Sequence, residues 1–180
     1  MDKAKGITHD QLMYIMKGSK LSDIDNFIEP INNAMEQYEI NTPLRIAHFL
    51  AQLGHESGSL RYKEEIASGA AYEGRADLGN THPGDGRKFK GHGLIQLTGR
   101  TNHTDYAKYV GDMDLVENPW RIALEPEHSA GAAGWFWMTR KLNTLADQDD
   151  IMKITKRING GYNGLEDRKT YLVRAKSALS

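Results

Sequence analysis

Residues 46–106 read IAHFLAQLGHESGSLRYKEEIASGAAYEGRADLGNTHPGDGRKFKGHGLIQLTGRTNHTDY, and they carry the strongest signals in the chain. A helical pattern of apolar residues runs directly into a carboxylate, Glu56. Two more carboxylates, Glu64 and Glu65, follow, and a glycine-rich segment then extends from Gly69 to Gly99. Soluble helices usually end in solvated residues or glycine. An acid that closes an apolar run therefore indicates a functional site.

The segment before this acid is expected to be the buried central helix. Thr42-Pro43 supplies a capping hydroxyl followed by proline at the first helical position, and apolar residues then cover most of the helix surface. In one continuous helix Glu65, nine residues after Glu56, would lie on the opposite face. The two acids can face each other only if the chain breaks between them, and the Ser-Gly-Ser sequence at 57–59 is where it can break.

Two carboxylates across a cleft are what glycoside hydrolysis requires. One protonated carboxyl group donates to the leaving oxygen, and a carboxylate acts from the other side. Glu56 suits the acid, because apolar neighbours on its helix would partly desolvate the carboxyl group and favour its protonated form. Glu65 is the expected base. The spacing also fits a reading of Glu64 and Glu65 as an ordinary solvated acidic pair.

Length and composition predict one domain spanning residues 1–180, with no separate second domain. The absence of cysteine excludes disulfides, thiolate zinc sites and cysteine nucleophiles. A net charge of -1 argues against a nucleic-acid binder. The charge is uneven, however: residues 1–150 hold 16 Lys/Arg and 22 Asp/Glu, a net of -6, and residues 151–180 hold 7 and 2, a net of +5. This basic end either approaches an anionic polymer or balances an acidic body.

No segment reads as a targeting or membrane signal. The first six residues lack the apolar centre of a signal peptide, and no run approaches the length of a membrane span. We therefore expect no stable membrane insertion and a protein that is cytoplasmic where it is made.

The remainder predicts a mainly α fold with a small β component (α+β). Thr8 and Ser22 are candidate helix caps, and Pro30 is expected to break or kink the second helix. Asp85-Gly86, flanked by short polar segments, predicts a small β-hairpin. Further helices are expected over residues 127–138, 149–158 and 165–179.

Metal and nucleotide sites are disfavoured. His48 and His55 could share a helix face, but no His-Glu-x-x-His motif occurs, and a catalytic zinc needs three protein ligands at defined spacing. His55 is expected instead to hydrogen-bond the acid. The glycine pairs at 84–86 and 91–93 lack the Gly-Lys-Ser/Thr of a phosphate loop. No cofactor is expected.

Five motifs follow one another in the chain. They are His55-Glu56-Ser57; Tyr72-x-x-Arg75-x-x-Leu78-Gly79-Asn80; Gly84-Asp85-Gly86; Phe89-x-Gly91-x-Gly93-Leu94-Ile95-Gln96-Leu97-Thr98-Gly99-Arg100-x-Asn102; and Ile158-Asn159-Gly160-Gly161-x-Asn163-Gly164 followed by Arg168. In this order they resemble glycoside hydrolase family 19, the chitinase-type lysozyme fold, and more closely its phage endolysin branch. The resemblance covers roughly residues 42–179.

The resemblance implies a role for each matching residue. The general acid falls on Glu56, the general base on Glu65 with Glu64 as the alternative, and the water-holding hydroxyl on Thr98. Substrate-binding roles are implied for His55, Tyr72, Gln96, Asn102, Asn159 and Arg168. The chain departs from the family at His92, where arginine is common, and at His103, where an aromatic residue is common, and either change is expected to alter sugar subsites. It also lacks the disulfides and extra loops of plant-type members, which weakens the case for chitin.

The resemblance further implies a two-lobed, lysozyme-like helical fold, with the β-hairpin region lining a cleft, and inversion at the anomeric carbon. We therefore expect a monomeric muramidase whose partner is bacterial peptidoglycan, not nucleic acid. As an endolysin it would accumulate in the host bacterial cytoplasm and reach the wall through a holin lesion. A chitinase on the same scaffold and a catalytically silent wall-binding module are the alternatives.

Overall fold

The computed structural model describes residues 6–180, and its regular elements are helices. Within this range no strand forms, and pairing is limited to isolated bridges of His92 with Glu64 and with Leu97. The helices and short 3-10 turns are α1 (His9–Ile15), α2 (Leu21–Gln37), α3 (Pro43–Ser57), η1 (Ala70–Tyr72), η2 (Ala76–Leu78), α4 (Asp85–Lys88), α5 (Arg100–Val110), α6 (Asp114–Glu117), α7 (Arg121–Leu124), α8 (Pro126–Thr139), α9 (Leu142–Asp147), α10 (Ile151–Asn159) and α11 (Leu165–Leu179).

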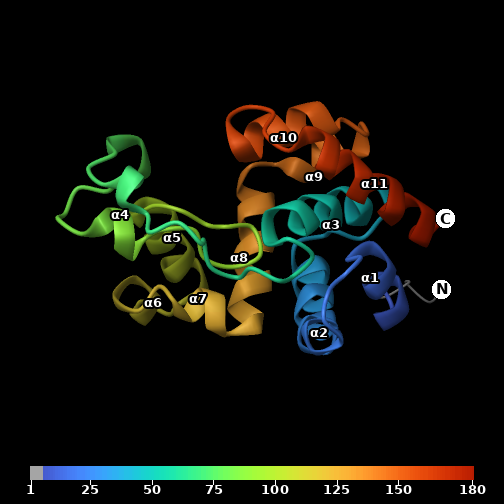
Figure 1. Ribbon diagram of the computed structural model, residues 1–180, viewed down its shortest axis with the longest axis horizontal. Helices are drawn as coiled ribbons and strands as arrows, with labels where there is room; N and C mark the ends of the chain where they lie inside the picture. The colour runs from blue at the N-terminus through green and yellow to red at the C-terminus, as the bar shows by residue number, and fades with distance from the viewer. Residues whose placement is uncertain (1–5) are drawn as a thin grey trace.

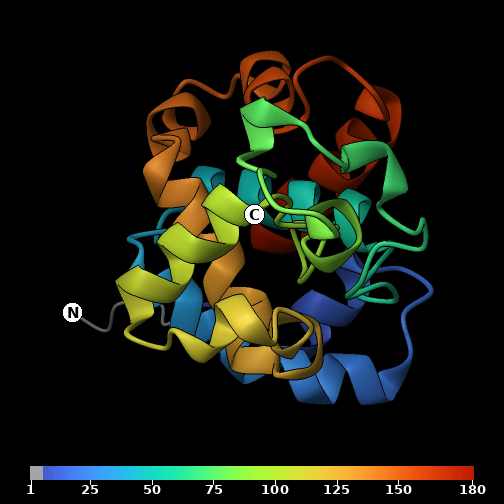
Figure 2. The same cartoon turned by 90° about the vertical axis from the view of Figure 1, so that its left-hand side faces the viewer.

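The helices form two groups around α8. Figure 1 shows α4, α5, α6 and α7 on one side of α8, with α1, α2, α3, α9, α10 and α11 on the other. Seen from the side of the first group, α5 and α7 stand in front of α8 (Figure 2). One cluster of buried hydrophobic side chains includes residues of both groups, from Ile7 to Ala175. The mainly helical fold is thus confirmed. In the described part of the chain, no helix has both the length and the apolar character that crossing a bilayer requires.

Helix α3 is buried along most of its length, as expected of a central helix. It begins where the sequence predicts, because Thr42 Oγ1 accepts a hydrogen bond from the Arg45 amide at 3.2 Å and Pro43 is the first helical residue. It packs closely on α11: a Cβ on Gly54 would lie 2.4 Å from the Tyr171 ring. This glycine therefore allows the approach of the helix that carries the basic C-terminal residues.

The chain leaves the helix immediately after Glu56. Helix α3 ends at Ser57, and Gly58 adopts the left-handed conformation (φ 56°) that typically terminates a helix. Ser57 Oγ donates to the Leu53 carbonyl at 2.6 Å and accepts from the Leu60 amide at 2.8 Å, which fixes the turn. The break expected at residues 57–59 is present.

The β-hairpin predicted at Asp85-Gly86 is not found, and these residues begin the short helix α4 instead. Tertiary contacts decide the local structure. The Glu73 carboxylate accepts hydrogen bonds from the amides of Gly84 and Gly86, both at 2.8 Å, and Arg100 forms a two-bond pair with Asp85. A Cβ on Gly86 would lie 2.5 Å from the Glu73 amide nitrogen, so the glycine serves close backbone approach and not a hairpin turn.

Helix α2 runs unbroken through Pro30, contrary to the expected break. The N-cap position is Lys20, whose side chain makes no capping hydrogen bond. Ser22 lies inside the helix and is therefore not the cap that the sequence predicted. Pro30 and its neighbours Phe27 and Ile31 are buried. Burial of this apolar face compensates for the hydrogen bond that proline cannot donate.

Candidate active site

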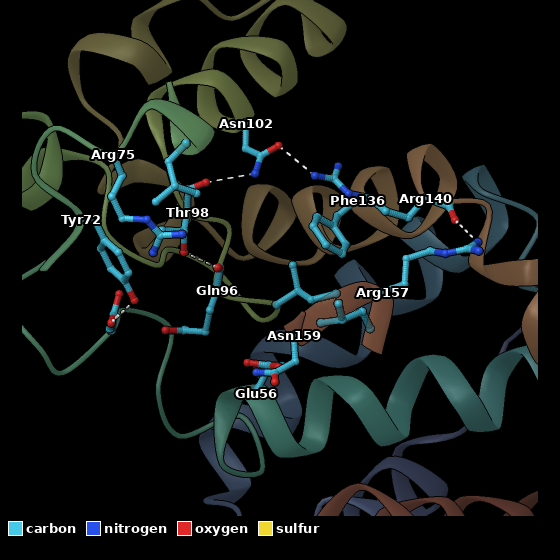
Figure 3. A pocket seen from close by; sticks show the side chains of 14 residues that line it. Glu56, Tyr72, Arg75, Gln96, Thr98, Asn102, Phe136, Arg140, Arg157 and Asn159 are labelled. Carbon is cyan, nitrogen blue, oxygen red and sulfur yellow. Dashed lines mark hydrogen bonds between the residues drawn. The ribbon is translucent and has the colours of Figure 1, made fainter. Parts of the chain in front are cut away.

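An open pocket of about 490 Å³ lies where the end of α3, the glycine-rich segment, α8 and α10 meet (Figure 3). It brings together seven of the nine residues that the sequence singled out, namely Glu56, Glu65, Tyr72, Gln96, Thr98, Asn102 and Asn159. The other two, His55 and Arg168, do not line it. Residues far apart in the chain thus converge on one polar cavity.

Glu56 is held by a buried arginine. Its Oε1 lies 2.8 Å from Arg168 Nη2, and the Arg168 side chain is only 1% exposed, against 18% for Glu56. Arg168 also donates to Gln52 Oε1, and its Nε donates to the Asn163 carbonyl at 3.1 Å. The expected apolar surroundings of the acid are therefore replaced, on one side, by a fixed positive charge that orients the carboxyl group.

Glu65 projects into the pocket and both its carboxylate oxygens are bound. Tyr72 Oη donates to Oε1 at 2.7 Å, and the Gly91 amide donates to Oε2 at 2.9 Å. Burial, followed by the hydrogen bond to Glu65, raises the pKa of Tyr72 to about 12, so the phenol keeps its proton and remains a donor at neutral pH. Figure 3 shows Tyr72, which binds Glu65, and Glu56 on different sides of the pocket.

Glu64 lies outside the pocket. Its carboxylate is 3.2 Å from Lys90 Nζ and 3.9 Å from His92 Nε2, and 49% of the side chain is exposed. The structure therefore places Glu65, and not its neighbour, where a base could act. The catalytic role of Glu65 stays a prediction.

Thr98 presents a hydroxyl group at the pocket wall. Its Oγ1 donates to the Gln96 carbonyl at 2.8 Å, which leaves the oxygen free to accept a hydrogen bond from water. Gln96 has a φ of 58°, a left-handed conformation that non-glycine residues rarely adopt. Its side-chain Nε2 donates to the Gly93 carbonyl at 3.0 Å. This tight turn fixes both side chains relative to the acids.

Asn102 and Asn159 enter the pocket from different helices. Asn102 Nδ2 donates to the Thr98 carbonyl at 3.0 Å, and its Oδ1 accepts from Arg140 Nη2 at 3.0 Å. Asn159 ends α10, and its Oδ1 accepts from the Asn163 amide at 3.3 Å. Both side chains line the pocket, and their contacts with sugar stay a prediction.

His55 does not contact the acid as expected. Its Nδ1 lies 2.7 Å from Asp167 Oδ2, and its ring packs against Gly164, where a Cβ would lie 2.1 Å from the ring. The histidine faces α11 and the preceding loop because Glu56, the next residue, projects from a different side of the helix. The structure therefore gives His55 a part in positioning this loop, and its predicted contact with substrate stays a prediction.

The two histidines that depart from the family pattern do not line the pocket either. His92 Nδ1 and His103 Nε2 lie 2.9 Å apart, and both side chains are buried. Burial lowers the pKa of His92 to about 4 and that of His103 to about 3, so both are neutral at pH 7. An effect of these two histidines on the sugar subsites stays a prediction.

Three arginines and one aromatic residue line the pocket although the sequence assigned them no role in the site. Arg75, Phe136, Arg140 and Arg157 all line it. Arg140 lies over the Phe136 ring at 4.0 Å from the centroid, and Arg157 donates to the Arg140 carbonyl at 3.0 Å. Arg75 stood in one of the sequence motifs without an assigned role, whereas Arg140 and Arg157 were visible only as charges, since no motif indicates which helix faces converge.

Comparison with known proteins assigns the chain to a family. The family described as chitinase class I, glycoside hydrolase family 19, matches residues 38–157. A glycosyl hydrolase family 19 domain-containing protein of Haemophilus influenzae is 31% identical over 171 residues, which cover 78% of this chain and 82% of that protein. The Arabidopsis thaliana endochitinase At2g43610 is 37% identical over 117 residues, 64% of this chain but only 39% of that protein. The chain thus spans about two fifths of the plant relative.

Solved structures share the fold at low sequence identity. Chitinase C from Streptomyces griseus superposes with a TM-score of 0.79 at 18% identity, covering 98% of this chain and 77% of that one. A bacterial family 19 chitinase superposes with a TM-score of 0.80 at 19% identity, covering 97% and 95%. The helical arrangement around α8 is therefore that of these chitinases.

Proposed function

The chain belongs to glycoside hydrolase family 19, and from this premise we propose that it is a muramidase that cleaves peptidoglycan between N-acetylmuramic acid and N-acetylglucosamine. The observation that carries the hydrolytic part is the placement of Glu56 and Glu65 in one open polar pocket, which Thr98 also lines. Three arginines in the pocket wall support an anionic glycan as substrate, because chitin is neutral.

The proposed reaction is a single displacement with inversion. The proton of Glu56 moves to the glycosidic oxygen as its bond to the anomeric carbon breaks. A water held by Thr98 bonds to that carbon from the opposite face, and Glu65 takes the proton that the water loses. Arg168 orients the acid, whereas Tyr72 and the Gly91 amide hold both oxygens of the base.

Product identity tests this proposal. Purified peptidoglycan and chitin oligosaccharides are digested in parallel, and the fragments are identified by mass spectrometry. Fragments that end in reducing N-acetylmuramic acid are expected. Reducing N-acetylglucosamine from peptidoglycan would mean that the other bond is cut. In the initial product the α anomer is expected by NMR, and a β anomer would overturn inversion.

Glu64 and Glu65 offer a matched pair of variants. Glu65→Gln should reduce turnover by about 10²–10⁴-fold, the usual contribution of a general base. Glu64→Gln makes the same chemical change one residue away, outside the pocket, and should leave hydrolysis near the wild-type rate. The reverse result would move the base to Glu64.

Two other functions give different outcomes. Similarity to plant endochitinases favours a chitinase, which would release sugar from chitin oligosaccharides and not from peptidoglycan. A silent wall-binding module would sediment with peptidoglycan and release no reducing ends.

We further propose that the enzyme is a monomeric phage endolysin that accumulates in the host cytoplasm and reaches the wall after a holin permeabilises the membrane. This part rests on the sequence resemblance. Bacteria that express the chain should remain intact until a membrane-permeabilising agent is added and should then lyse. Lysis without the agent would overturn the holin-dependent route.

A further inference from the structure

We propose that Arg140 is a specificity-determining residue whose guanidinium group binds a carboxylate of the peptidoglycan strand, a group that chitin lacks. The inference rests on the proposed function, since it assigns a substrate feature to the same pocket.

The position of Arg140 is fixed by neighbours on two helices. Its Nη1 donates to Thr139 Oγ1 at 2.9 Å, its Nη2 donates to Asn102 Oδ1 at 3.0 Å, and the group lies 4.0 Å from the centre of the Phe136 ring. Figure 3 shows the side chain reaching across Phe136 toward Asn102, which in turn bonds the Thr98 carbonyl. The side chain of Asn102 therefore links the guanidinium group to Thr98, the residue proposed to position the water.

The charge of Arg140 has no counter-ion within residues 6–180. Burial lowers the pKa of its guanidinium group, and the only carboxylate that acts against this is Asp105, which forms no ion pair with it. Arginine nevertheless stays protonated in proteins. Two other arginines at or beside the site are paired with carboxylates: Arg75 bonds Asp77 at 3.1 Å, and Arg168 bonds Glu56. An unpaired, half-buried cation carries a desolvation cost that a bound anion would offset.

Donors remain for such an anion. A guanidinium group carries five N–H donors, and in the described part of the chain Arg140 uses Nη1 and Nη2 for one bond each, both to neutral oxygens. Arg157 adds a second cation beside it, since its Nη1 donates to the Arg140 carbonyl at 3.0 Å and it too forms no ion pair within residues 6–180. Planar donor pairs of this kind match a carboxylate well.

The ligand chemistry follows from the two candidate glycans. Chitin is built from N-acetylglucosamine alone and carries no charge. Every second sugar of peptidoglycan bears a lactyl ether, whose carboxyl group is either free or joined to a stem peptide that has carboxylates of its own. The ligand is therefore a carboxylate, and its source is either the lactyl group or the stem peptide.

Four substrates of similar length separate these possibilities. They are peptidoglycan strands with stem peptides, strands stripped of peptides by an amidase, stripped strands whose lactyl carboxylates are converted to neutral methylamides, and chitin oligosaccharides. The variants are Arg140→Gln, Arg140→Lys and, as the control, Arg87→Gln, which removes one positive charge from α4 outside the pocket. Melting curves check that each variant is folded.

Arg140→Gln should lower kcat/KM about 10- to 100-fold on carboxylate-bearing strands, mainly by raising KM, since a hydrogen-bonded charge pair contributes on that scale. Its effect on methylamide strands and chitin oligosaccharides should be several-fold at most. Arg140→Lys keeps the charge without the planar fork and should retain part of the preference. Arg87→Gln should leave the ratio between charged and neutral strands unchanged.

The pattern of losses identifies the carboxylate. A loss confined to peptide-bearing strands assigns it to the stem peptide, and a loss that persists on stripped strands but not on methylamides assigns it to the lactyl group. Equal losses on charged and neutral strands would overturn this inference and leave the proposed function standing. A wild-type enzyme that cleaves chitin but none of the peptidoglycan strands would overturn the proposed function itself.

Discussion

Glu56 is bound to a buried arginine, so its replacement affects both chemistry and stability. Glu56→Gln retains an oxygen that accepts from Arg168 but carries no exchangeable acid proton. Hydrolysis of peptidoglycan should fall by about 10²–10⁴-fold. The substitution also removes the carboxylate that faces Arg168, whose side chain is only 1% exposed. Because a buried charge without its partner is unfavourable, the free energy of unfolding should fall by about 1–3 kcal/mol in urea titrations. Near-normal hydrolysis by the folded variant would remove Glu56 from the mechanism.

Thr98 is expected to act through its hydroxyl oxygen alone. Serine keeps that oxygen, so Thr98→Ser should retain most of the turnover measured on peptidoglycan. Thr98→Ala removes the group that positions water and also the bond to the Gln96 carbonyl, and it should cause a large loss in kcat. Small and similar effects of the two substitutions would leave Thr98 as a turn residue only.

The chemistry-bearing residues could be identified from sequence because reactions restrict which side chains serve. Glu56, Glu65 and Thr98 all reach the pocket, as predicted. Arg140 could not be found in this way, since its proposed role depends on a contact with Asn102, 38 residues away, and on the lack of an ion pair within residues 6–180. Arg168 was named through the family resemblance, but its bond to Glu56, 112 residues away, was not predicted.

At the scale of single elements, the short helix α4 is held in place by an ion pair. The Asp85 carboxylate, whose side chain is 2% exposed, bonds Arg100 Nε at 2.7 Å and Nη2 at 2.8 Å and accepts from the His82 amide at 3.1 Å. Asp85→Asn leaves Arg100 without its counter-charge and should lower the free energy of unfolding by about 3 kcal/mol at pH 7.

The same pair predicts a dependence on pH. The bond to Arg100 is the main reason that the pKa of Asp85 lies below its ordinary value of 3.8. A lowered pKa in the folded state means that the pair contributes its full stability above pH 3.8 and loses it as the pH falls further. Urea titrations of the wild type and Asp85→Asn should therefore converge only below about pH 4. Convergence already near pH 6 would show that another group is responsible.

Local sequence signals, such as capping residues, predicted several of the helices correctly. Thr42-Pro43 and Thr8 begin α3 and α1, and the range 165–179 is that of α11. They misled at Asp85-Gly86, where a sequence typical of hairpins becomes a helix because Glu73 and Arg100 bind it from elsewhere in the chain. Contacts of this kind outweigh the preferences of a two-residue turn.

At the scale of the whole molecule, the basic C-terminal region is only partly available to a partner. Lys176 Nζ lies 2.7 Å from Asp149 Oδ2, and Lys169 Nζ lies 3.4 Å from Glu166 Oε1. Lys153 also lies 3.6 Å from a carboxylate, Asp150 Oδ2, but its side chain is 67% exposed, and Lys156 is exposed as well. Both belong to α10, the helix whose last residues line the pocket. This helix therefore carries well-exposed positive charge of residues 151–180.

This placement predicts that Lys153 and Lys156 steer the enzyme toward an anionic wall. The double variant Lys153→Gln/Lys156→Gln should lyse cell walls several-fold more slowly at low salt, because attraction over long range speeds encounter. Lys17→Gln/Lys20→Gln removes the same charge from exposed positions between α1 and α2, away from the pocket, and should have a smaller effect. At about 1 M salt the screening length is roughly 3 Å, so all three enzymes should reach one rate. A deficit of the α10 variant that persists at high salt would contradict steering, since screening would then have removed the attraction without restoring the rate.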